Sequence, residues 1–259
     1  MYVCHADRFI FQLLLGPGQR AAEVGVYRGE YSRGLLARAP AELVLVDAWR
    51  MPDKADLLPS DCHIDAAARI EETFAEYYPG GMAAALAQAE REVMETLAGE
   101  PGVRILKMSS QAAVATFADN SLDFVYIDAN HRFDFVLSDL IRWSQKVAAG
   151  GCIVLNDCYV SQVGALQFLS VMEAASQFMK LHDWAPLALN TTAYGDLVLV
   201  RKDDLQARGG NLSALAQKIF SILIPNGIPF VEVPDALVHA AMHKPLRVDG
   251  QPFEYLSFA

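Results

Sequence analysis

Residues 186–202, "PLALNTTAYGDLVLVRK", decide the fold, because they hold two apolar runs with very little chain between them. The runs at 186–190 and 196–202 are separated only by "TTAYG". Parallel neighbours need a crossover of a dozen or more residues, whereas antiparallel neighbours need only a short turn. We therefore predict an antiparallel hairpin at this point in the chain.

Five further apolar runs precede the hairpin and alternate with helical stretches. They lie at 21–26, 42–49, 103–108, 124–129 and 152–157. Their near-continuous Val, Ile and Leu content suits strands that are covered on both faces. The alternation predicts an α/β fold, a doubly wound, seven-stranded, mostly parallel sheet that ends in the C-terminal antiparallel hairpin.

Two segments lie outside this alternation. We predict one domain over residues 1–203 with a helical insertion at 50–102, followed by a C-terminal extension at 204–259. In the insertion, "GMAAALAQAEREVMETLAGEPG" predicts a helix that ends at Gly99, with Pro101 beyond it. In the extension, the stretches 211–224 and 233–246 are both predicted to be helical.

Composition narrows the kinds of partner. The formal net charge is −10, so a surface that grips nucleic-acid phosphates is not expected, and a small molecule is the default ligand. No stretch approaches the roughly 20 apolar residues that span a bilayer, so no membrane association is expected. The four cysteines show no C-x-x-C spacing, which favours a reducing, cytoplasmic compartment: Cys4, Cys62, Cys152 and Cys158.

A glycine turn follows the first apolar run, in "EVGVYRGEYS" at residues 23–32. Gly25 and Gly29 are four positions apart, which does not fit the G-x-G-x-x-G spacing of a dinucleotide site. The second run ends on Asp47, where a carboxylate can accept hydrogen bonds from ribose hydroxyls. The acid Glu23, the glycine turn after it and the second acid, Asp47, together indicate an adenosine ligand without a pyrophosphate.

The sequence resembles class I S-adenosylmethionine (SAM)-dependent methyltransferases. "EVGVYRG" matches their E-x-G-x-x-x-G motif, and "LVLVDAW", "SLDFVYIDANHRFDFVLSDLIRWSQKVAAGGCIVLNDC" and the hairpin follow in the family's order. The resemblance covers about residues 20–202 and is strongest to small-molecule O-methyltransferases of the catechol and macrocin type. It implies transfer of a methyl group from SAM to a hydroxyl of a small-molecule acceptor.

The same resemblance implies the residues that bind the cofactor. Residues of the glycine loop would hold the methionine part, Asp47 the ribose, and residues after the second and third runs the adenine. The full set is Glu23, Gly25, Tyr27, Gly29, Asp47, Ala48, Trp49, Ser109, Ser110 and Asp128.

Two groups in "DFVYIDANH", residues 123–131, are candidates for catalysis. Asp128 ends the fourth run, and Asn156 and Asp157 end the fifth, so their oxygens should converge at one sheet edge. Such a set is a partial shell for Mg²⁺, which could orient the acceptor and lower the pKa of its hydroxyl. His131 would take the hydroxyl proton as general base.

Structural roles remain open for both groups. Asp128 could instead bind the cofactor's amine or cap the next helix, and His131 could bond only a backbone carbonyl. Two competing functions remain as well, a metal-independent N-methyltransferase and a SAM-binding module without turnover. A nicotinamide oxidoreductase is disfavoured by the glycine spacing.

The insertion and the extension are expected to form the acceptor pocket, a lid or a homodimer contact, and to set specificity. Aromatic residues that could line the pocket, or belong only to the core, are Trp49, Phe74, Tyr77 and Tyr78. His239 and His243 share a helical spacing but lack the Glu of an H-E-x-x-H metal site, so a surface or interface helix is the preferred interpretation.

Overall fold

The computed structural model describes residues 1–50, 78, 80–158, 171–191, 195–205, 214–233, 245–248 and 251–254. The strands are β1 (Tyr2–Cys4), β2 (Arg20–Val24), β3 (Glu42–Asp47), β4 (Val103–Lys107), β5 (Leu122–Ile127), β6 (Val147–Leu155), β7 (Trp184–Asn190), β8 (Leu197–Arg201), β9 (Phe230–Glu232), β10 (Pro245–Val248) and β11 (Gln251–Glu254). The helices are the 3₁₀ helix η1 (Arg8–Leu14), α1 (Glu30–Leu36), α4 (Met82–Leu97), α5 (Ser110–Val114), α6 (Phe133–Trp143), α8 (Val171–Leu181), α9 (Lys202–Leu205) and α10 (Ala214–Leu223).

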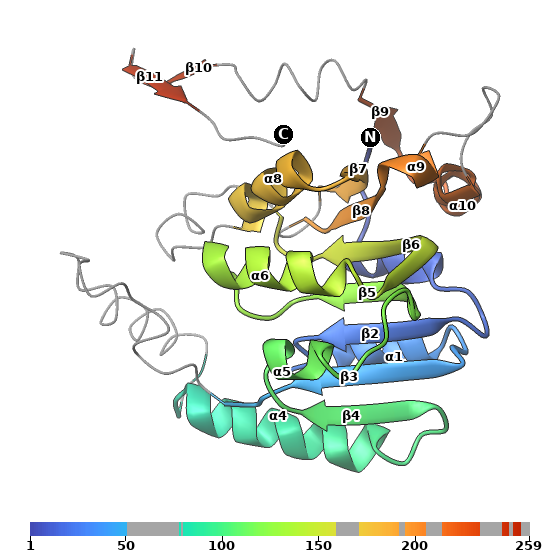
Figure 1. Cartoon of the computed structure of the whole chain (residues 1–259), viewed down its shortest axis with the longest axis vertical. Helices are drawn as coiled ribbons and strands as arrows, with labels where there is room; N and C mark the ends of the chain where they lie inside the picture. The colour runs from blue at the N-terminus through green and yellow to red at the C-terminus, as the bar shows by residue number, and fades with distance from the viewer. Residues whose placement is uncertain are drawn as a thin grey trace.

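A nine-stranded sheet in the order β4-β3-β2-β5-β6-β8-β7-β1-β9 forms the centre of the molecule (Figure 1). Strand β8 is antiparallel to both β6 and β7, and β9 is antiparallel to β1, whereas the other pairs are parallel. Strands β10 and β11 form a separate antiparallel pair. The α/β fold class is therefore confirmed, and so is the hairpin.

Helices cover both faces of the sheet because its strands are apolar on both sides. On one face, residues such as Leu45 and Tyr126 pack with η1, α1, α4 and α10. On the other, residues such as Val46 and Ile127 pack with α5, α6 and α8, which lie in front of the sheet in Figure 1. This two-sided burial explains the continuous apolar runs in the sequence.

The strand bounds agree with the sequence predictions, apart from β6. That strand begins at Val147, five residues before the predicted run, because "VAAGG" joins the pairing with β5 through an irregular register. The helices predicted at 81–99 and 211–224 are present as α4 and α10. The helix predicted at 233–246 is wrong at its described ends, since Val233 is not helical and Pro245 and Leu246 begin β10. The rest of it lies outside the described residues, as do Cys62, Phe74, Tyr77, His239 and His243.

Two strands at one side of the large sheet, β1 and β9, were not predicted, and neither was the β10–β11 pair. β1 pairs in parallel with β7, and β9 then pairs with β1, so the sheet has nine strands rather than seven. Each has only three residues, too few for the periodicity of a strand to show in the sequence. The ring of Tyr2 packs edge-on against Phe220 of α10 and Phe230 of β9, with centroids 4.8 and 6.4 Å apart.

The remaining general predictions concern thiols and membranes. Cys4, Cys152 and Cys158 are free and buried. Within the described ranges, no helix has the length and apolar character needed to cross a bilayer.

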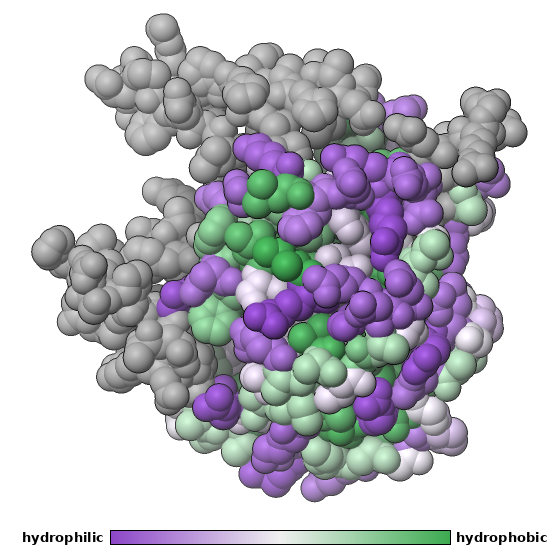
Figure 2. All heavy atoms as spheres, in the orientation of Figure 1, coloured by the Kyte–Doolittle hydropathy of each residue, from purple (hydrophilic) through white to green (hydrophobic). Residues whose placement is uncertain are grey.

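The face over α5, α6 and α8 mixes hydrophilic and hydrophobic side chains (Figure 2).

We predict that Tyr2→Ala lowers the free energy of unfolding by about 3 kcal/mol, because it removes a buried aromatic ring that joins β1 to α10 and β9. Urea denaturation measures this change. The matched control is Val231→Ala on β9, whose side chain is 66% exposed, with an expected change within about 0.5 kcal/mol. Equal stability of the Tyr2 variant and the parent protein would show that β1 is not part of the cooperative fold.

Candidate active site

The candidate site lies where the sheet order reverses. The chain runs from β2 outward through β3 to β4, then returns to place β5 on the other side of β2. Ligands of open α/β sheets bind at the carboxyl ends of the strands beside such a switch point. The glycine turn, Asp47 and Asp128 all follow strands at this edge.

The glycine turn passes directly against β5. The amide of Asp128 donates to Val24 O over 2.7 Å, and the amide of Gly25 donates to Val46 O over 2.9 Å. A Cβ at Gly25 would lie 1.9 Å from the carbonyl oxygen of Asp128. Gly25 also has φ +90°, a conformation that L side chains rarely adopt. Glycine is therefore required here by both space and backbone conformation.

Asp47 joins the turn after β2 to the turn after β3. Its Oδ2 accepts hydrogen bonds from the amides of Val26 and Tyr27 at 2.9 and 3.0 Å, and Oδ1 accepts from the amide of Trp49 at 2.7 Å. Trp49 is buried, and its Nε1 donates to Tyr27 O over 2.9 Å, whereas Ala48 is half-buried. Asp47 thus shapes the turn in which a ribose would lie.

Three of the five non-glycine residues with positive φ in the described part of the chain lie at the same edge. Tyr27, Trp49 and Asp157 all have positive φ, at 49°, 43° and 55°, although none is glycine. Each follows a different parallel strand. Left-handed backbone in non-glycine residues gathers at functional sites, where surrounding contacts hold it in place.

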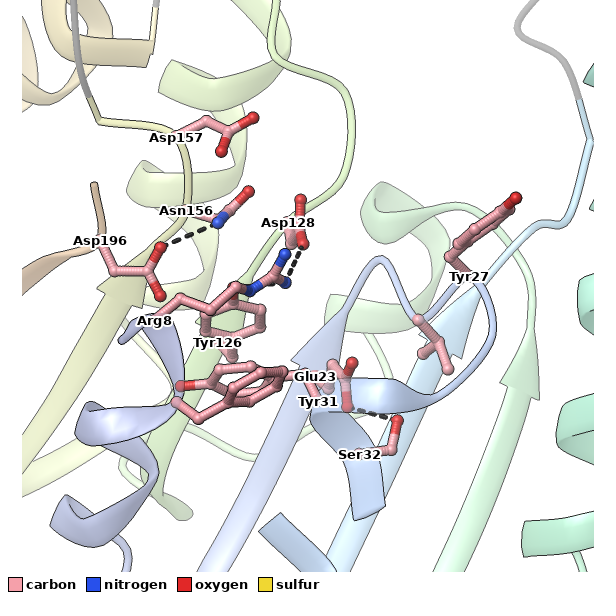
Figure 3. A network of polar contacts seen from close by, with 12 residues as sticks. Arg8, Glu23, Tyr27, Tyr31, Ser32, Tyr126, Asp128, Asn156, Asp157 and Asp196 are labelled. Carbon is pink, nitrogen blue, oxygen red and sulfur yellow. Dashed lines mark hydrogen bonds and ion pairs between the residues drawn. The ribbon is translucent and has the colours of Figure 1, made fainter. Parts of the chain in front are cut away.

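Glu23 is held beneath the glycine turn. It is 1% exposed, and its Oε2 accepts a hydrogen bond of 2.6 Å from Ser32 Oγ on α1 (Figure 3). Burial raises the pKa of the Glu23 carboxyl well above its ordinary value, and the Ser32 hydrogen bond opposes that rise. The cationic amino group of a bound cofactor would favour the charged form of this carboxyl.

Asp128 lies between the guanidinium of Arg8 and the imidazole of His131. Its Oδ2 accepts a hydrogen bond of 3.1 Å from Arg8 Nη2, and its Oδ1 lies 3.3 Å from His131 Nε2. His131 Nδ1 in turn lies 3.4 Å from Asp157 Oδ2. Arg8, Asp128, His131 and Asp157 therefore form a row in which nitrogen-bearing side chains alternate with carboxyl groups.

The two carboxylates favour a protonated His131. Burial disfavours the charge, but the contact with Asp128 and the charges of Asp128 and Asp157 outweigh it and raise the pKa of His131 above 6.5. Burial also raises the pKa of Asp157, against the charge of His131. Each ring nitrogen of His131 thus faces a carboxylate at 3.3–3.4 Å, and Nε2 has no hydrogen-bond partner among the described residues.

The predicted metal ligands do not fit a divalent cation well. Asp128 is paired with Arg8, and Asn156 Nδ2 donates to Asp196 Oδ1 over 2.8 Å. The guanidinium of Arg8 already supplies positive charge beside Asp128. Among the described residues, no group of three or more His, Cys, Asp or Glu side chains is arranged to hold a metal ion.

Ser109 and Ser110 lie after β4, and the side chain of Ser110 contacts α6. Ser109 Oγ accepts from the amide of Ala112 and caps α5. Ser110 Oγ donates to Asp139 of α6 and accepts a hydrogen bond of 2.8 Å from Trp143 Nε1. The hydroxyl of Ser110 thus connects α5 to α6.

Three polar residues of the site were not singled out from the sequence. Arg8 enters from η1, Tyr126 Oη accepts from Arg8 Nη2 over 3.1 Å, and Asp196 lies just before β8. Burial raises the pKa of Asp196 to about 7. Because β8 is antiparallel, its first residues lie at the same edge as the last residues of the parallel strands. The acid directly before the last apolar run could therefore have predicted Asp196 as a site residue.

Comparison with known proteins identifies the family. A family model described as a methyltransferase domain matches residues 22–158, which is more than half of the 259 residues. The chain belongs to this methyltransferase family and is a SAM-dependent methyltransferase. This confirms the enzyme class predicted from the sequence. No curated protein matches the chain.

Solved structures resemble the chain only distantly. A Corynebacterium glutamicum protein is 14% identical, with a TM-score of 0.47 over 75% of this chain and 81% of that one. The SAH-bound methyltransferase PaMTH1 of Podospora anserina is 14% identical, with a TM-score of 0.44 over 71% and 72%. Spermidine synthase of Thermotoga maritima is 12% identical, with a TM-score of 0.46 over 90% and 74%. At these values none of the three bears on the acceptor.

We predict that Gly25→Ala destabilises the fold by more than about 3 kcal/mol and weakens SAM binding at least tenfold, because β2 and β5 must separate to admit the methyl group. Denaturation and calorimetry measure the two effects. Gly18→Ala is the matched control, with φ +75° and open space around its Cβ, so it carries only the backbone strain of about 1–2 kcal/mol. Similar losses in both variants would contradict the close-approach argument.

We also predict that NMR titration of the His131 ring gives a pKa above 6.5, and that Asp157→Asn lowers this pKa by removing one of two flanking carboxylates. Asn tolerates the left-handed backbone at position 157. Asp183→Asn, at a fully exposed position, should leave the pKa unchanged. A His131 pKa that does not respond to Asp157→Asn would show that the two side chains do not interact.

Proposed function

We propose that the protein transfers the methyl group of SAM to a hydroxyl of a small-molecule acceptor, with His131 as general base. The observation that carries this proposal is the imidazole of His131, held between Asp128 and Asp157 at the edge where the glycine turn lies. The His131 side chain is 17% exposed, and both of its ring nitrogens face carboxylates, an arrangement that suits proton transfer.

The reaction needs one proton transfer and one displacement. A lone pair of the acceptor oxygen attacks the methyl carbon, the sulfur–methyl bond breaks, and its electron pair stays on sulfur to give S-adenosylhomocysteine (SAH). The hydroxyl proton passes to a nitrogen of His131. Proximity and alignment of oxygen, carbon and sulfur supply much of the acceleration, since the methyl group is already activated by the sulfonium.

Protonation of His131 sets the pH dependence of this step. Only the neutral imidazole can accept a proton, and the raised pKa of His131 keeps the charged form dominant to higher pH. The rate should therefore increase with pH along a limb centred above 6.5. Asp128 and Asp157 then stabilise the imidazolium that the reaction generates.

No step is assigned to a metal, because the described donor set does not fit one. The same observation favours the second candidate, metal-independent methylation of an amine, which needs the same base to neutralise an ammonium acceptor. The two candidates share Glu23, Asp47, Asp128 and His131 and differ only in the acceptor atom.

The test is SAH formation by chelator-treated protein with panels of hydroxylated and amine acceptors, measured by mass spectrometry. We expect turnover with hydroxyl acceptors, and a loss of roughly 10²- to 10⁴-fold in His131→Gln with little change in SAM affinity. His5→Gln is the control, since His5 is exposed and its Nδ1 lies 3.2 Å from Thr191 Oγ1. Turnover restricted to amines, or full activity of His131→Gln, would contradict the proposal.

A further inference from the structure

The amino-acid end of SAM carries two opposite charges that a site must meet. Its ammonium group pairs with carboxylates. Glu23 and Asp128 are two of the acids beside the glycine turn, whereas the third, Asp47, accepts hydrogen bonds from backbone amides. The carboxylate of SAM needs a cation or a set of N–H donors. Figure 3 shows the Arg8 side chain reaching between these acids and Asp196, over the stacked rings of Tyr31 and Tyr126.

Arg8 is positioned by the segment that precedes the family match. It is the first residue of η1, and the N-cap Asp7 accepts a hydrogen bond of 2.9 Å from the amide of Phe9. Its guanidinium carbon lies 5.9 Å from the ring centroid of Tyr31 and 5.6 Å from that of Phe9. Tyr31 in turn stacks on Tyr126 at 3.6 Å. These rings fix the plane of the guanidinium.

The guanidinium retains donors for a ligand. Its two hydrogen bonds to described residues, to Tyr126 Oη and Asp128 Oδ2, are both made by Nη2. Nε is buried and has no hydrogen-bond partner in the part of the chain that the structure describes. A guanidinium has five N–H donors in a fork that matches a carboxylate. The Arg8 side chain is also 36% exposed, so a ligand can reach it.

We propose that Arg8 binds the α-carboxylate of SAM while Asp128 and Glu23 face its ammonium group. This inference rests on SAM as the cofactor. Arg8 lies outside residues 22–158, so the family match says nothing of this contact. Asp128 positions Arg8 through their ion pair. When the ligand's carboxylate also binds the guanidinium, the negative charge of Asp128 is compensated less by Arg8 and can interact with the ligand's ammonium group.

Calorimetry with SAH and with its decarboxylated analogue tests the contact. Arg8→Met keeps the apolar stem and removes the charge, so SAH affinity should fall at least tenfold, or about 1.4 kcal/mol. Affinity for the analogue, which lacks the carboxylate, should change less than about twofold. Arg8→Lys keeps the charge without the fork and should give an intermediate loss for SAH.

Arg20→Met is the matched control, because Arg20 pairs with Glu42 at the opposite end of β2 and should affect neither ligand. Thermal unfolding checks that each variant is folded. If Arg8→Met does not fold, the proposal is tested with Arg8→Lys and the parent protein. The parent must then bind SAH at least tenfold more tightly than the decarboxylated analogue.

Equal losses for SAH and the analogue would overturn the proposal, because Arg8 would then act only through the fold or through Asp128. Unchanged SAH affinity in Arg8→Met would overturn it as well. Either result would reject the role of Arg8 without rejecting the proposed methyl-transfer function. Absence of SAM and SAH binding by the parent protein is a different failure, one that removes the cofactor assignment and this inference together.

Discussion

The close passage of the glycine turn over β5 is the constraint on which the site depends. Gly25 leaves room for the carbonyl of Asp128, and the Asp128 amide reaches Val24 O. This contact brings together the ends of two strands that are about one hundred residues apart in the sequence. Glu23 below the turn, Asp47 beside it and Asp128 across from it keep their relative positions only while the two backbones touch.

Electrostatics explains why so many acids can gather at this edge. Glu23, Asp157 and Asp196 are all partly or wholly buried, and burial raises the pKa of each. Arg8 and His131 offset part of this cost, since each contacts Asp128. A cationic ligand would relieve the remaining repulsion. The charged forms of these acids would be favoured by a cationic ligand, in agreement with the sulfonium cofactor proposed above.

The sequence predicted most of the fold because its signals are local. Continuous apolar runs mark the inner strands, and the short gap before Asp196 marks the hairpin. Short strands such as β1 carry no comparable signal, since pairing with β7 and β9 is a long-range property. The same limit applies to the site. Asp47 and Asp128 could be found at strand ends, whereas Arg8 reaches Asp128 across 120 positions. The orientation of Asn156 toward Asp196 likewise depends on the antiparallel placement of β8.

The additions to the family's core sheet have a consequence for the site. β1 lies between β7 and β9, with the amide of His5 donating to Pro229 O and that of Thr191 to Cys4 O. Only three residues separate the end of β1 from Arg8. The position of Arg8 therefore depends on β9, which belongs to the C-terminal extension, as well as on the core. α10 and β9 also contact the ring of Tyr2. The contacts of residues 2–8 with 230–232 therefore connect two parts of the chain that lie outside residues 22–158 to the edge that holds Asp128.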